Sequence, residues 1–178
     1  MGIIRNTTEN NCNIAIWDTQ ETLDEILKLS KPFDLIRLKT EKRKKEFLTS
    51  RLLLEQLSPN AIITYNDFGA PELDNGKYIS ISHSKEMVAI IISEQQVSID
   101  IEQISEKALR LSSKFVSAKN LTHLTKEKAT LIWCLEEVVF KWHQKGGVDF
   151  IKDIIIPEFS AKEKGEIAIQ FKNKELNL

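Results

Sequence analysis

Residues 78–102 read YISISHSKEMVAIIISEQQVSIDIE, and this stretch decides the fold. Tyr78 to Ser82 alternates apolar and polar residues, Met87 to Ser93 is almost continuously apolar, and Val97 to Glu102 alternates again. Alternation with a period of two is typical of a half-buried strand, and a short apolar run of a fully buried one. The sequence therefore predicts three consecutive β-strands.

A long helix is predicted on each side of this strand region. The first spans about 40–57, with an apolar side and a stop at Ser58-Pro59. The second spans 126–145, with Thr125 as its N-cap and Gly146-Gly147 as its stop.

Shorter elements complete the expected organisation. Residues 13–17 alternate as a strand does, and residues 21–29 carry apolar residues at helical spacing. Asp74-Asn75-Gly76 is a turn signal of the hairpin kind, because Gly readily adopts the positive φ of such turns. Residues 154–159 and 166–171 are expected to form a closing β-hairpin.

Asp100 and Glu102 are the first candidates for a functional site. Successive side chains on a strand point to opposite faces, so these two carboxylates are expected on one face, with Ile99 and Ile101 on the other. Such a pair could hold a hard cation such as Mg²⁺. An edge strand with two solvated acids is the alternative.

Ser82-His83-Ser84 ends the first of the three strands. Serine hydroxyls, an imidazole and exposed backbone N–H groups can all donate to phosphate oxygens, so this corner could bind phosphate. The alternative is that His83 is an ordinary capped loop residue.

The helix at 126–145 has two distinct sides. A broad apolar side is expected to pack on the sheet, and it comprises Leu131, Ile132, Leu135, Val138, Val139 and Trp142. Trp133, Glu137 and Lys141 recur at four-residue intervals on the other side. This row could belong to a site, or it could contain only an exposed Glu–Lys pair.

The helix at 40–57 begins with a strongly basic run. The cations are Arg37, Lys39, Lys42, Arg43, Lys44, Lys45 and Arg51. The run could be a solvated helix face, or it could attract an anionic ligand or an acidic partner protein.

Composition limits the classes of protein that fit. The 178 residues are 42% hydrophobic and 29% charged, as is ordinary for a globular protein, and the net charge of -1 gives no global attraction to nucleic acid. The two cysteines, Cys12 and Cys134, are far apart, which argues against a disulfide framework. The sequence has no signal-peptide core and no long apolar run, so a cytoplasmic protein without a membrane partner is expected.

The order of these segments resembles the 4′-phosphopantetheinyl transferase superfamily, in particular its single-chain, surfactin-synthetase-activating type. That family shows an SHS segment, then G-[VI]-D-[IV]-E, then [RK]-F-x-S, then W-[ST]-x-K-E-A-x-x-K on a helix. The counterparts here are ISHS at 81–84, SIDIE at 98–102, KFVS at 114–117 and WCLEEVVFK at 133–141. Phe68-Gly69-Ala70-Pro71 is similar to the family's G-K-P segment.

The resemblance implies an α+β fold with two similar halves, each of which pairs an antiparallel sheet with a long helix. The halves would be residues 1–95 and 96–178, with the helices at 40–57 and 126–145 as equivalents. The site would lie in the cleft between them, so one monomer would suffice.

The resemblance also implies a reaction. These enzymes transfer the phosphopantetheine arm of coenzyme A to a serine of an apo acyl or peptidyl carrier protein. Asp100, Glu102 and Glu137 would hold Mg²⁺, and Glu137 would also act as the base. Lys141 would point at the pyrophosphate of coenzyme A. Ser82 and His83 would bind its phosphates, and residues 68–71 would lie along its adenine.

Three positions depart from the family pattern. Glu136 replaces a lysine beside a site for a polyanion, although its projection about 100° from Glu137 could turn it outward. Ala70 replaces the lysine of the G-K-P segment, and Ser98 replaces a glycine. These changes motivate an alternative, a weakened relative that binds coenzyme A or a carrier protein without efficient transfer. A nucleic-acid-binding module is a further alternative, although the basic helix has little aromatic interleaving.

Overall fold

The computed structural model describes residues 2–178 and is mixed α+β, with antiparallel sheets and several helices. Backbone contacts divide the chain into two compact units, one ending at Ile101 and the other running from Glu102 to Leu178. Each unit contains one sheet of three or more strands and one long helix. The equivalence of the two halves and a cleft between them stay predictions.

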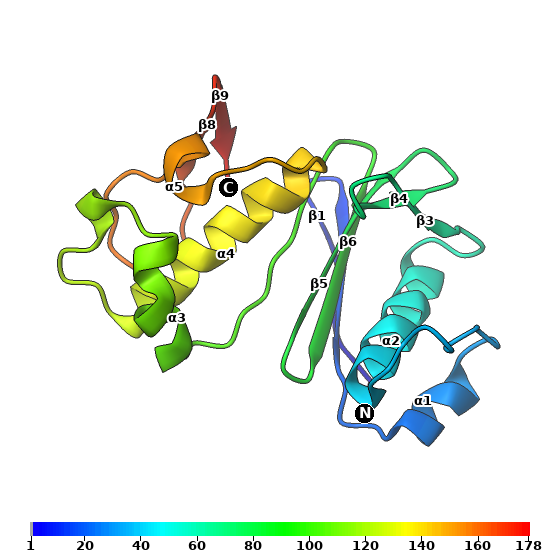
Figure 1. The fold of residues 1–178 in the computed structure, drawn as a ribbon. Coiled ribbons are helices and arrows are strands. Elements are labelled where there is room, and N and C mark those ends of the chain that lie inside the picture. Colours follow the sequence, from blue (N-terminus) through cyan, green and yellow to red (C-terminus); the bar gives the residue numbers. More distant parts are fainter. Residues whose placement is uncertain (1) are drawn as a thin grey trace. The chain divides into compact units, whose positions relative to one another are not determined.

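The first unit is built on a four-stranded antiparallel sheet of order β1-β2-β6-β5 (Figure 1). It also contains helices α1 and α2 and a small two-stranded sheet. The elements are β1 (Gly2–Glu9), β2 (Cys12–Asp18), α1 (Leu23–Leu29), α2 (Glu41–Leu57), β3 (Ile63–Tyr65), β4 (Pro71–Leu73), β5 (Tyr78–Ser84) and β6 (Met87–Ser93).

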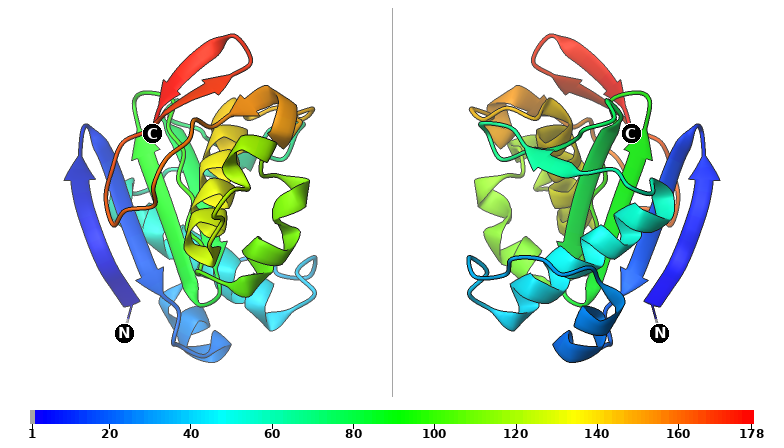
Figure 2. Two further views of the ribbon diagram at one scale, coloured as in Figure 1. Left: turned by 90° about the vertical axis from the view of Figure 1, so that its left-hand side faces the viewer. Right: turned by 90° about the vertical axis from the view of Figure 1, so that its right-hand side faces the viewer.

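Helix α2 covers one face of this sheet, as the right-hand view of Figure 2 shows. Thr40 begins the helix, because its hydroxyl accepts a hydrogen bond from the backbone N–H of Arg43 at 3.2 Å. Leu53 and Leu54 of the helix pack with apolar residues of the strands. The buried strand residues in this core are Ala15, Trp17, Ile79, Val88, Ile90 and Ile92.

Two-residue turns set the strand register on both sides of the sheet. β1 and β2 pair from Gly2↔Asp18 to Glu9↔Cys12 and are joined by Asn10-Asn11, both at positive φ. Such a turn matches the twist of the flanking strands, and asparagine tolerates positive φ better than most residues. β5 and β6 pair from Tyr78↔Ser93 to Ser84↔Met87.

The second unit packs helix α4 with a three-stranded antiparallel sheet of order β7-β8-β9. Two short 3₁₀ turns follow α3, at Ser112–Lys114 and Ala118–Asn120. The elements are α3 (Glu106–Leu111), α4 (Lys126–His143), α5 (Phe150–Asp153), β7 (Ile154–Ile155), β8 (Ala168–Phe171) and β9 (Lys174–Asn177). The core gathers Phe115, Val116, Ile132, Val139, Ile154, Ile156, Ile169 and Phe171.

Several predicted elements are confirmed. The strand at Met87–Ser93 has the predicted bounds, α2 lies within the predicted range 40–57, and α4 begins after the predicted cap, Thr125. The closing hairpin also forms, since Ile154 pairs with Phe171, but its strands are shorter than predicted and a third strand follows. Helix α4 ends at His143, because Gln144 adopts the left-handed conformation before the glycines are reached.

One strand prediction and one hairpin prediction are wrong. Val97 to Glu102 forms no strand, and the backbone N–H groups of Ile99 and Ile101 donate to the side-chain hydroxyls of Ser80 and Ser82, both at 3.2 Å. The turn at 74–76 is present, with Gly76 at φ +79°, but it joins no hairpin. Its flanking strands pair elsewhere, β4 with β3 and β5 with β6.

Over residues 2–178, none of the helices combines the length and the apolar character needed to cross a membrane.

Candidate functional site

A cavity of about 310 Å³ lies in the first unit, between α2, β5 and the β3–β4 region. Two arginines, a histidine, a glutamate, a tyrosine and a loop glycine are among its lining residues. These residues are Arg43, Glu46, Arg51, Tyr65, Gly69 and His83. The cavity therefore brings together three segments that the sequence analysis singled out separately: the basic helix, the residues 68–71 and the SHS corner.

Glu46 is a buried acid among the charged residues that line this cavity. Only 8% of the residue is exposed. Its Oε2 accepts a hydrogen bond from Arg43 Nη1 at 3.0 Å, and its Oε1 lies 3.6 Å from His83 Nδ1 and 3.7 Å from Lys42 Nζ. A buried carboxylate is costly unless cations compensate it, and Glu46 has such compensation.

His83 is held from its other ring nitrogen as well. Its Nε2 lies 3.0 Å from Arg43 Nη1. A guanidinium has only donors, so Nε2 must accept this hydrogen bond. His83 is thus fixed between Glu46 and Arg43 rather than being an isolated loop residue.

Arg51 is a second arginine in the lining of the cavity. Its guanidinium carbon lies 3.8 Å from the ring centre of Phe47, and its Nη2 donates to the Tyr65 hydroxyl at 3.1 Å. A guanidinium stacked on an aromatic ring keeps donors available in a fixed plane. This arrangement can present a flat, positively charged surface to an anionic or aromatic ligand.

Asn66 shapes the loop that brings Gly69 to the cavity. Its side-chain oxygen accepts hydrogen bonds from the N–H groups of Phe68 and Ala70, both at 3.0 Å. The Gly69 N–H donates to the Asn66 carbonyl at 2.9 Å, and Gly69 has φ +79°. The loop is therefore a compact, internally bonded turn, and Ala70 adds no charge to it.

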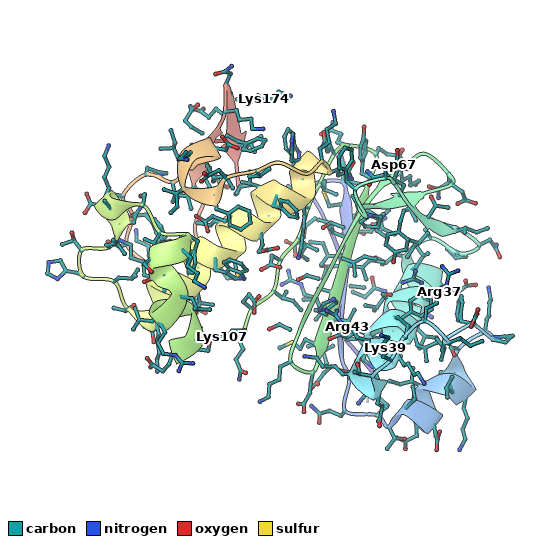
Figure 3. The ribbon with its side chains drawn as sticks, in the orientation of Figure 1. Arg37, Lys39, Arg43, Asp67, Lys107 and Lys174 are labelled. Atoms are coloured by element: carbon teal, nitrogen blue, oxygen red, sulfur yellow. The ribbon has the colours of Figure 1, made fainter. Side chains whose placement is uncertain are left out.

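The rest of the basic run is distributed around the same end of α2. Arg37, Lys39 and Arg43, labelled in Figure 3, come from the first turn of the helix and the loop before it. Lys45 differs, because its ammonium donates to the Thr19 carbonyl at 3.1 Å. The run thus combines cavity residues with residues that tie the helix to the rest of the unit.

Ser82 contacts Asp100 within the first unit. The Ser82 hydroxyl donates to Asp100 Oδ1 at 2.7 Å, and Ser82 is 3% exposed. A buried hydroxyl in this position orients the carboxylate. Direct phosphate binding by Ser82 stays a prediction.

Glu102 contacts helix α4 within the second unit. The indole Nε1–H of Trp133 donates to Glu102 Oε1 at 3.1 Å. Trp133 is in turn fixed by Phe115 and Phe150, whose ring centres lie 5.2 and 5.8 Å from its own. Glu137 and Lys141 follow Trp133 by one and two turns of α4, so Glu102 is attached to the start of the predicted row.

The three predicted metal ligands fit Mg²⁺ in the chemistry of their oxygen donors. Asp100 lies in the first unit, and Glu102 and Glu137 lie in the second. Across residues 2–178, however, His, Cys, Asp and Glu form no group of three or more that could hold a metal ion. The metal site therefore stays a prediction.

Glu136 departs most clearly from its expected position. It is 2% exposed, so it does not turn outward, and among the described residues its Oε2 has no hydrogen-bond partner. Burial, followed by repulsion from Glu137, raises the pKa of Glu136 to about 9. The side chain is therefore protonated at neutral pH and does not bring the negative charge that its identity implies.

Sequence reasoning missed Glu46 and Tyr65 as site residues, and it treated Arg51 only as part of a charge run. One local signal was present for Glu46, which follows Lys42 and Arg43 by four and three residues, the spacing of helical ion pairs. The proximity of Glu46 to His83 is a tertiary contact, which local spacing does not encode.

No family model matches the chain. Part of the chain is similar to the 4′-phosphopantetheinyl transferase gsp of Aneurinibacillus migulanus, with 38% identity over 73 residues. The match covers 39% of this chain and 31% of that transferase, so the chain spans less than a third of the relative's length. This partial similarity supports the resemblance to the 4′-phosphopantetheinyl transferase superfamily.

Proposed function

We propose that the protein transfers the 4′-phosphopantetheine arm of coenzyme A to a serine of an apo acyl or peptidyl carrier protein. The observation that carries the proposal is the cavity of the first unit, where Arg43, Arg51 and His83 line one hollow with the Gly69 loop. A polyanionic nucleotide needs clustered donors of this kind. The partial similarity to a 4′-phosphopantetheinyl transferase supports a transferase.

In this proposal the cavity binds the nucleotide end of coenzyme A. Arg43 binds phosphate oxygens and is held in place by His83 Nε2, and the Gly69 loop and the stacked Arg51 lie along the adenine. Ser82 does not line this cavity, because it alternates with His83 along β5, and it contributes by orienting Asp100.

Glu137 and Lys141 carry the chemistry in the proposal. The carrier serine oxygen attacks the phosphorus next to the pantetheine arm while Glu137 takes the hydroxyl proton. The bond from that phosphorus to the adenosine bisphosphate breaks, so the products are the modified carrier and 3′,5′-ADP. Lys141, one turn after Glu137 on α4, stabilises the negative charge of the pyrophosphate.

Asp100, Glu102 and Glu137 would hold Mg²⁺, whose positive charge neutralises the pyrophosphate when bound. The contacts from Ser82 to Asp100 and from Trp133 to Glu102 support these roles, because ligating carboxylates are usually held by hydrogen bonds. The proposal further includes a monomer in the cytoplasm, with no nucleic-acid or membrane partner.

The second candidate function is binding without efficient transfer. Ala70 favours it, because the loop beside the cavity lacks the lysine of the family pattern. Glu136 gives this candidate little support. A charged glutamate there would oppose the polyanion, but the side chain is buried and uncharged at neutral pH.

One experiment separates the two candidates. The purified protein is incubated with Mg²⁺, coenzyme A and several apo carrier proteins, and each carrier is weighed by mass spectrometry. Transfer predicts a mass gain equal to one phosphopantetheine group on at least one carrier, and that gain should disappear with EDTA. Saturable binding of coenzyme A with no mass gain on any carrier would establish the second candidate instead.

A further inference from the structure

Glu46 has a combination of properties that the proposed reaction does not use. It is a buried acid inside a cavity proposed to bind an anion, where a negative charge by itself opposes binding. Its carboxylate contacts Arg43 at 3.0 Å and His83 at 3.6 Å, the two groups that also meet each other at 3.0 Å. Glu46, Arg43 and His83 therefore form a closed triangle, with the acid as its least exposed member.

The triangle determines which nitrogen of His83 carries the proton. Nε2 accepts from Arg43, so the hydrogen of the neutral ring resides on Nδ1. Nδ1 faces Glu46 Oε1, and a carboxylate stabilises an N–H directed toward it. Glu46 thus supports this tautomer twice, directly at Nδ1 and by holding the Arg43 guanidinium that donates to Nε2.

The same carboxylate fixes Arg43. The Arg43 side chain is 60% exposed, and an arginine this accessible adopts many rotamers unless something holds it. The hydrogen bond to the buried Glu46 confines the guanidinium to the cavity wall. A cation that is already in place loses less conformational entropy when an anion binds.

We infer that Glu46 is a positioning residue, which pre-arranges Arg43, directly and through His83, for the phosphate groups of the nucleotide. This inference rests on the proposed function for the identity of the ligand. The negative charge of Glu46 by itself would weaken the binding of an anion. The inference is that the carboxylate nevertheless strengthens this binding, because it holds its neighbours in place.

The sign of that effect is the test. Glu46→Gln keeps the shape and removes the charge, so simple electrostatics predicts tighter binding of an anion, whereas positioning predicts weaker binding. Isothermal titration calorimetry with adenosine 3′,5′-bisphosphate should show a Kd about tenfold higher in Glu46→Gln than in the unsubstituted protein. Glu46→Asp, which keeps the charge on a shorter side chain, should recover part of the loss.

The matched control is Glu55→Gln on the same helix. Glu55 also pairs with a cation, Lys31 at 3.0 Å, but its side chain is 43% exposed and does not line this cavity. The nucleotide Kd of Glu55→Gln should equal that of the unsubstituted protein. In turnover assays, Glu46→Gln should raise KM for coenzyme A and leave kcat close to its original value.

A spectroscopic measurement tests the inference independently of activity. Imidazole ¹⁵N chemical shifts, recorded above the pH range in which histidine protonates, should show His83 as the Nδ1–H tautomer and a loss of that preference in Glu46→Gln. An unchanged tautomer, or an equal or lower nucleotide Kd in the variant, would overturn the inference. If the unsubstituted protein binds no nucleotide, the proposed function fails, and the tautomer measurement still decides the role of Glu46.

Discussion

The two long helices, α2 in the first unit and α4 in the second, each bury a glutamate, and the surroundings of the two acids are opposite. Glu46 on α2 lies within 4 Å of Lys42, Arg43 and His83. Glu136 on α4 has another acid, Glu137, as its charged neighbour, and the pKa of Glu136 rises to about 9.

This difference shows that burial alone does not determine what a glutamate does. The same side chain is a compensated charge that organises a cavity in one unit and a protonated, uncharged group in the other. Whether a buried acid on these helices can act as a charged group therefore depends on the cations beside it.

Among the substitutions considered, those of the adjacent residues Glu136 and Glu137 on α4 should differ most in their effect on the rate of carrier modification. Glu137→Gln should lower the rate of carrier modification by at least about 100-fold, because the proposed base is lost. Glu136→Gln should keep most of the activity, because Glu136 is already uncharged at neutral pH. Carrier mass spectrometry measures both rates, and circular dichroism checks that both variants fold. Near-normal turnover in Glu137→Gln would remove this residue from the mechanism.

Glu136 should also make stability depend on pH. Its pKa is about 9 in the folded protein and near 4.5 in the unfolded chain, so the folded state binds more protons between these values. Stability should therefore fall as pH rises through this window. Relative to Glu136→Gln, the unsubstituted protein should lose about 3 kcal/mol between pH 5 and pH 7. Urea titrations of both proteins at the two pH values measure this difference, and parallel pH profiles would contradict it.

Removing a partner of Glu46 should have a smaller effect. Arg43→Gln leaves the buried carboxylate with less compensation, which destabilises the protein. Because the Arg43 side chain is 60% exposed and water screens its charge, the expected loss is only about 1 kcal/mol at neutral pH. Urea denaturation measures it, and a gain in stability would show that Glu46 does not need this cation.

The smallest effect is expected for the exposed glutamate of α2. Glu55→Gln breaks only the surface pair with Lys31, so the free energy of unfolding should change by less than about 0.5 kcal/mol. A larger loss of unfolding free energy in the same urea assay would mean that the exposure of a glutamate on α2 does not predict its contribution to stability.

Local patterns predicted the fold where each element carries its own signal. The apolar run Met87–Ser93, the apolar side and Ser58-Pro59 stop of α2, and the Thr125 cap of α4 were sufficient to place three elements. Strand β1 was missed, because Gly2–Glu9 is an edge strand with mostly exposed residues and has no apolar alternation. Residues 97–102 were assigned as a strand from alternation alone, which does not reveal that serine hydroxyls accept two of the N–H groups.

The candidate site shows the same limit. Sequence motifs identified His83 and the Gly69 loop, and the structure places both at one cavity. The role inferred for Glu46 depends on a histidine 37 positions later in the chain, beyond the reach of helical spacing. The charge state of Glu136 likewise depends on its burial. A glutamate is usually exposed, so the sequence alone did not predict this burial.

The two serine hydroxyls that hold residues 99–101 also have a kinetic consequence. A hydroxyl rotates about a single bond, whereas a strand carbonyl is fixed by the whole ladder, so the amides of Ile99 and Ile101 can be released by local motions that leave β5 in place. Their hydrogens should exchange with deuterium sooner than those of Ile90 and Ile92 in the centre of the sheet. The segment that carries Asp100 can then adjust its position at low energetic cost while the sheet beneath it stays rigid.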